Sequence, residues 1–112
     1  MDVVFKIPDY VTVGAVSFKI LFNTDMVKKL DDRAFVSFKD QEIWLRDDMT
    51  DSQLLTNLLH EIKHVVDDTA GIEIRESEVV ATGNLMAQAL ISMGIRPDFS
   101  GIKQRGDNEN KG

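Results

Sequence analysis

Residues 50–71 read TDSQLLTNLLHEIKHVVDDTAG, and this stretch decides how the second half of the chain folds. Its first four residues have the capping-box form, in which Thr50 is the N-cap and the Gln53 side chain reaches back to the backbone of Thr50. Apolar residues then recur at helical spacing from Leu54 to Val66. Gly71 is the residue type that most often stops a helix in the left-handed conformation. The stretch therefore predicts one helix that follows Thr50 and stops at Gly71.

The predicted helix contains HEIKH at residues 60–64, a match to the H-E-x-x-H pattern. Residues four apart lie on one helical face, so His60 and His64 can reach one ion at the ~2.0–2.1 Å of a zinc–nitrogen bond. Glu61 points aside from this pair, where it can hold a water molecule rather than the metal. The chain has 2 histidines, and both belong to the motif, on the side of the helix opposite the leucines. We therefore expect a zinc site here rather than two ordinary surface histidines.

A third zinc ligand must be a carboxylate, because the chain has no further histidine and no cysteine. The candidates that follow the motif are Asp67, Asp68, Glu73, Glu76 and Glu78. Asp67 and Asp68 lie on the same helix as His64, from which they cannot easily approach the ion from another direction. They are better suited to accept a hydrogen bond from an imidazole.

Glu78 is the preferred third ligand, because of the pattern of a second predicted helix over residues 75–93. The positions that share a helical face with Glu78, at 82, 85, 86 and 89, are mostly apolar. A carboxylate that points into a core is costly unless it is paired or bound to metal. Glu76 falls on a different face, with residues 80, 83 and 87. The alternative role for Glu78 is that of a first-turn acid that complements the helix dipole.

The rest of the chain predicts a small sheet and a polar tail. Apolar or alternating stretches at 3–7, 11–22, 34–38 and 43–45 indicate strands, and the last two form a hairpin. A polar turn with a short helix is expected between residues 23 and 32, and Gly94 and Pro97 are stop signals for the second long helix. Residues 100–112 are polar and rich in Gly and Asn, so we expect disorder there. The prediction is an α+β fold with a single domain over residues 1–99, in which a sheet of three or four strands packs on two helices and the first helix carries HEIKH.

Composition narrows the class of protein. The chain has 112 residues, of which 43% are hydrophobic, enough for one domain with a modest core. A formal net charge of −6 argues against a nucleic-acid partner and against an anionic membrane surface. No apolar run approaches the ~20 residues of a membrane span, and the first residues lack the order of a signal peptide. We therefore expect a soluble cytoplasmic protein, whose lack of cysteine excludes a disulfide scaffold and a thiol nucleophile.

A family resemblance is carried by residues 58–90, which read LLHEIKHVVDDTAGIEIRESEVVATGNLMAQAL. This stretch resembles the ImmA/IrrE-type zinc metallopeptidases, above all the short forms encoded by phages and other mobile elements. Those proteins combine an H-E-x-x-H helix with a following helix that opens Glu-x-x-Ala-Asn, and here that element reads EVVAT from Glu78. The resemblance implies a minimal zincin-like domain with Zn²⁺ held by His60, His64 and Glu78 and with Glu61 as the general base. Lys63 departs from the family, in which an apolar or small residue is more usual.

The same resemblance implies a peptidase that cuts a regulatory protein of a phage or mobile element. A hairpin strand around Ile43–Leu45 would form the edge of the cleft and hold an extended peptide substrate by adding it to the sheet. Two other functions remain open: a non-catalytic module in which zinc staples the two helices and the hairpin edge binds a partner, and a metal-free α+β interaction protein. A Glu61→Gln change separates the peptidase from the binding module, because only the peptidase needs the general base. A folding stability that does not respond to a chelator would favour the metal-free protein.

Overall fold

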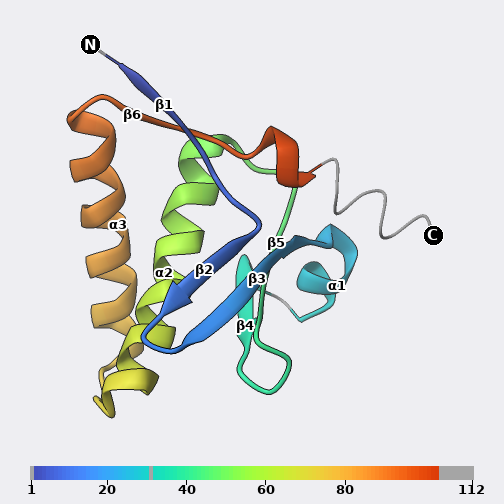
Figure 1. The fold of residues 1–112 in the computed structure, drawn as a ribbon, viewed down its shortest axis with the longest axis vertical. Coiled ribbons are helices and arrows are strands. Elements are labelled where there is room, and N and C mark those ends of the chain that lie inside the picture. The colour runs from blue at the N-terminus through green and yellow to red at the C-terminus, as the bar shows by residue number, and fades with distance from the viewer. Residues whose placement is uncertain (1, 31, 104–112) are drawn as a thin grey trace.

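Two small sheets and two long helices make up most of the structure, a computed structural model that describes residues 2–30 and 32–103 (Figure 1). The larger sheet is mixed and has the strand order β2 (Tyr10–Val13), β3 (Val16–Phe22), β5 (Glu42–Leu45) and β4 (Ala34–Ser37). The smaller sheet pairs β1 (Val3–Lys6) with β6 (Ile95–Asp98), and the helices are α1 (Thr24–Lys29), α2 (Asp51–Ala70) and α3 (Glu76–Ser92). This arrangement confirms the predicted α+β class. Within the described residues, none of the helices has both the length and the apolar character that a bilayer crossing requires.

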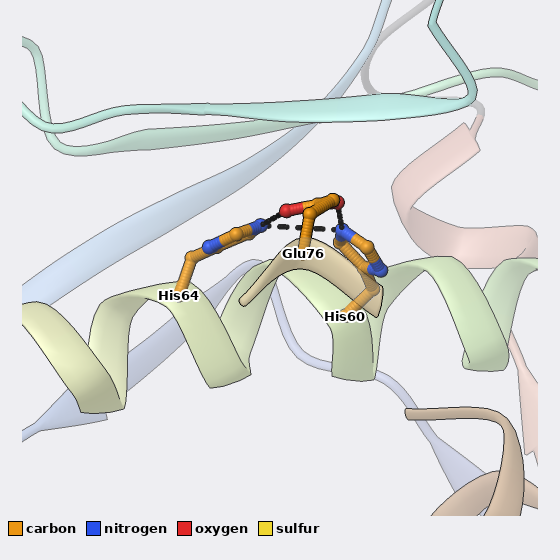
Figure 2. A group of neighbouring side chains, drawn as sticks. All are labelled: His60, His64 and Glu76. Carbon is orange, nitrogen blue, oxygen red and sulfur yellow. Dashed lines mark hydrogen bonds and ion pairs between the residues drawn. The ribbon is translucent and has the colours of Figure 1, made fainter. Parts of the chain in front are cut away.

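Helix α2 begins and ends where the sequence predicts. The Thr50 hydroxyl accepts a hydrogen bond from the backbone N–H of Gln53 at 3.2 Å, and the Gln53 side chain accepts one from the backbone N–H of Thr50 at 2.9 Å. At the other end Gly71 has a φ of 69°, in the left-handed region. The two end signals fix where α2 lies along the sequence. HEIKH consequently falls in the middle of the helix, from which His60 and His64 project on one side (Figure 2).

The core lies between α2 and the larger sheet. Ile43 and Leu45 are fully buried and Trp44 between them is half-buried, as the alternation predicts. On α2, one helical face carries buried residues at regular spacing: Leu54, Leu58, Glu61 and Val65. Glu61 is therefore a carboxylic acid within an otherwise apolar stripe.

Strand β5 lies inside the larger sheet and not at its edge. It pairs in parallel with β3 on one side and antiparallel with β4 on the other. The expectation that the strand around Ile43–Leu45 forms an edge is therefore wrong, because β3 pairs with it across a long connection that no local pattern reveals. Strand β4 occupies the edge instead, and it packs against α2.

The smaller sheet brings the two ends of the described chain together. Strand β1 lies beside β6 and pairs with it in parallel (Figure 1). In this pairing Val3 lies opposite Ile95 and Phe5 opposite Pro97. Gly94 and Pro97 do follow the end of α3, as expected of stop signals for that helix. The sequence did not predict that Pro97 would lie within a strand, β6.

The predicted tail begins later than residue 100. Residues 100–103 are helical, and Phe99 and Ile102 are 0% and 3% exposed in the main core cluster. The expected disorder is therefore wrong for residues 100–103, because burial of Ile102 anchors them to the core. The rest of the predicted tail, residues 104–112, lies outside the described residues.

Candidate metal centre

Three side chains converge at one point on the side of α2 (Figure 2). The Nε2 atoms of His60 and His64 lie 3.2 Å apart. The carboxylate of Glu76 spans both rings, with Oε1 2.8 Å from Nε2 of His60 and Oε2 3.1 Å from Nε2 of His64. The histidines stand one turn apart on α2, as the motif predicts, and Glu76 is the first residue of α3. Two helices joined by residues 71–75 therefore build the site together.

The spacing of these donor atoms suits a metal ion, for which zinc sets the scale. Two ligand atoms at ~2.0–2.1 Å from a tetrahedral zinc ion lie about 3.3 Å from each other. The two imidazole nitrogens, 3.2 Å apart, are close to that value, and each lies 2.8 or 3.1 Å from a different oxygen of the Glu76 carboxylate. Two imidazoles and one glutamate are also the ligand set of known catalytic zinc sites, which keep a fourth position open. The three residues could therefore hold a metal ion.

The structure brings Glu76, and not the preferred Glu78, to the histidines. The buried residues of α3 follow Glu76 at the spacing of one helical face: Val79, Gly83 and Ala87. On the face of Glu78, by contrast, Leu85 and Met86 are 63% and 51% exposed. This face of α3 packs against α2 because the small residues Gly83 and Ala87 let the two helix backbones come close. The signal that could have selected Glu76 was therefore the glycine and alanine on its face rather than the larger apolar residues on the other.

Glu61 is buried beside the three converging side chains. Its side chain belongs to the apolar stripe of α2, and the residue is 6% exposed. Burial, together with the negative charges of Asp32 and Glu76, raises the pKa of the Glu61 carboxyl to about 8. A group whose pKa lies near neutrality is matched to taking up and releasing a proton during a reaction.

A surface pocket of about 420 Å³ opens beside Glu61 and contains polar residues that the sequence did not single out as functional. Arg33, the residue before the edge strand β4, and Asn84 of α3 both line it. Asn57 of α2 also lines it, and its only sequence signal was a place on the same helical face as His60. All three side chains can donate hydrogen bonds to a ligand in the pocket.

Lys63, the departure from the family pattern, has a partner of its own. Its Nζ lies 2.6 Å from Oδ1 of Asp67, whose side chain is 6% exposed. The expected imidazole partner of Asp67 is thus replaced by a lysine one turn earlier on the same helix. Asp68 beside it is exposed. Lys63 therefore offsets the charge of a buried acid.

Comparisons with known proteins add no relative: no protein-family model matches the chain, and no curated protein or solved structure matches it significantly. The candidate site rests on the geometry of His60, His64, Glu76 and Glu61.

Proposed function

We propose that the protein is a zinc-dependent peptidase in which His60, His64 and Glu76 hold the metal and Glu61 is the general base. The observation that carries this proposal is the meeting of two imidazole nitrogens, 3.2 Å apart and each within 3.1 Å of one oxygen of the same carboxylate, beside a buried carboxyl group. Burying an acid in an apolar stripe costs stability, and a catalytic role accounts for that cost. The proposal keeps the roles that the motif gives to residues 60–64 and assigns the third ligand to Glu76 in place of Glu78.

Each residue has a distinct task in the proposed reaction. When bound, zinc supplies a Lewis acid that polarises the scissile carbonyl and lowers the pKa of water. Glu61 takes the proton from the attacking water and passes it to the nitrogen of the leaving amine. Burial, with the negative charges of Asp32 and Glu76, keeps Glu61 basic, because both disfavour the ionised carboxylate. Arg33 lines the same pocket and can bind a carbonyl oxygen of the peptide.

The edge strand β4 is the proposed place for an extended peptide. One edge of β4 pairs with β5, and no other strand within the described residues pairs with its opposite edge. Its first residue, Ala34, lines the same pocket as His60 and Glu61. A peptide that adds to this edge through main-chain hydrogen bonds would pass beside the metal site. The family resemblance makes a regulatory protein of a phage or mobile element the proposed substrate class.

The test measures metal and hydrolysis on the same preparations. Untagged protein is loaded with zinc, its metal is measured by elemental mass spectrometry, and it is incubated with a mixed peptide library whose new termini are identified by mass spectrometry. The wild type should retain about one zinc per chain and cut peptides. Glu61→Gln should retain the zinc and lose roughly 100-fold or more of the cleavage rate. A wild type that holds no zinc after loading would overturn the proposal.

A zinc-stapled binding module is the second candidate, and the origin of the ligands in two helices favours it. In such a module zinc would raise the free energy of unfolding by linking α2 to α3. The wild type would then bind zinc and cut no peptide, and Glu61→Gln would bind its protein partner as well as the wild type does.

A further inference from the structure

A second surface pocket, of about 440 Å³, lies next to the metal site on the side of His64. Its apolar walls come from Phe38, Ile72 and Ile74. Its polar lining, besides His64 itself, consists only of acids: Asp67, Asp68 and Glu73. Because His64 is shared with the candidate metal centre, a ligand in this pocket would lie directly beside the metal.

Asp67 is the buried acid of this pocket, and one of its carboxylate oxygens is unpaired. Oδ1 is held by Lys63 at 2.6 Å. Oδ2 is buried and has no hydrogen-bond partner among the residues that the structure describes. A buried carboxylate oxygen without a partner costs stability unless a donor reaches it, so it is a position at which a donor from a ligand would be stabilised.

The charge of the pocket is negative after the lysine has been counted. Lys63 offsets one of the three acids, and the exposed Asp68 and Glu73 add two further negative charges. No lysine or arginine stands among the described residues that line the pocket. A long basic side chain matches this surface, because its methylene stem packs on apolar walls while its charged end reaches carboxylates.

We propose that this pocket binds a lysine or arginine side chain of the peptide substrate. The inference deepens the proposed function and rests on it, since it places the basic residue relative to the bond that is cut. Strand β4 begins at Ala34, in the pocket beside Glu61, and is followed by Phe38, in the acidic pocket beside His64. A peptide paired antiparallel to β4 runs in the opposite direction. For a peptide in that orientation, the basic residue lies on the amino-terminal side of the scissile bond.

The first experiment tests the pocket without any cleavage. n-Butylguanidinium, which mimics an arginine side chain, is titrated into ¹⁵N-labelled zinc-loaded protein, and n-butanol serves as the uncharged probe. The guanidinium should shift the amide signals of residues 38, 67, 68 and 72–74, and butanol should not. Asp68→Asn combined with Glu73→Gln should weaken binding about threefold to tenfold, since each exposed carboxylate contributes modestly. The charge-matched control, Asp25→Asn with Glu78→Gln, alters two exposed acids that do not line the pocket and should bind as the wild type does.

The second experiment places the basic residue in the substrate. Peptides that differ only by Lys or Gln at one position are offered to the wild type, and the cut sites are sequenced. A preference for Lys on the amino-terminal side of the cut, reduced in the Asp68→Asn/Glu73→Gln variant, is the expected result. Cleavage without that preference would overturn this inference and leave the peptidase intact. If no peptide is cut, the guanidinium titration still tests whether the pocket binds a basic side chain. Equal binding of the guanidinium by the wild type and the double variant would overturn this inference.

Discussion

A β-carbon on Gly83 would lie 3.4 Å from both the Cα and the backbone nitrogen of His60. Helices α3 and α2 thus touch through backbone at the residue that supplies the first imidazole. Because Gly83 carries no side chain, α3 comes close enough for Glu76, two turns earlier on the same face, to reach both histidines. The helix contact and the metal centre are therefore parts of one arrangement.

Substitutions at Gly83 should show that stability and metal binding both depend on the close approach of α3 to α2. In Gly83→Ala the added methyl group meets His60 at ordinary contact distance, and alanine favours a helix by about 1 kcal/mol over glycine. We expect unchanged or slightly higher stability and unchanged zinc affinity. Gly83→Leu should push α3 away, cost about 1–3 kcal/mol and weaken zinc binding. Urea unfolding and a zinc-competition titration measure the two effects, and wild-type zinc affinity in the leucine variant would contradict the close contact.

The choice of third ligand is tested by a matched pair of glutamines. Glu76→Gln removes the carboxylate that spans His60 and His64, and zinc affinity should fall by roughly 100-fold or more, since loss of even a hydrogen-bond partner of a ligand costs about 10–100-fold. Glu78→Gln makes the same chemical change in the same helical turn and should leave zinc affinity unaltered. Competition with a chromogenic chelator measures the zinc dissociation constants of both variants. The reverse result would restore Glu78 as the ligand.

The buried Glu61 predicts a pH dependence for the metal-free protein. Its pKa is about 8 in the fold against an ordinary value of 4.5, so the fold binds the proton more tightly than the unfolded chain does. This group therefore lowers stability progressively as the pH rises from 4.5 to about 8, and its full cost is present above that range. Glu61→Gln removes the cost, and we expect a gain of about 2–4 kcal/mol at pH 9 and little change at pH 4. Urea unfolding in the presence of a chelator at both pH values measures this gain in stability. An equal stability difference between variant and wild type at the two pH values would refute the burial effect.

Ile102 tests where the folded domain ends. Because Ile102 is 3% exposed in the core, Ile102→Ala should cost about 2–4 kcal/mol in the free energy of unfolding. Ser100→Ala alters an exposed side chain two residues earlier and should change stability by less than about 0.5 kcal/mol. Both are read by chemical unfolding. If the isoleucine variant is as stable as the serine variant, residues 100–103 do not belong to the core.

The sequence by itself determined the local parts of this protein. The capping box at Thr50, the left-handed stop at Gly71 and the helical repeat between them involve residues within a few positions of one another, so α2 could be drawn before any fold was known. The same holds for the approach of His60 to His64, since one turn of helix brings them together. It holds also for the alternation at Ile43 and Leu45, which follows from the period of a strand.

Only the tertiary structure decided what depends on contacts between distant segments. Glu76 rather than Glu78 meets the histidines because α3 turns its small residues toward α2, and the pattern of α3 alone does not say which face will be covered. Strand β5 is not an edge strand, because β3 pairs with it. Strand β6 pairs with β1, which lies far from it in the sequence. The burial of Glu61 likewise needs the sheet and α2 together. In each case the free energy of folding depends on which surfaces pack against each other. The period of a helix or strand carries no information about a packing partner that lies far away in the sequence.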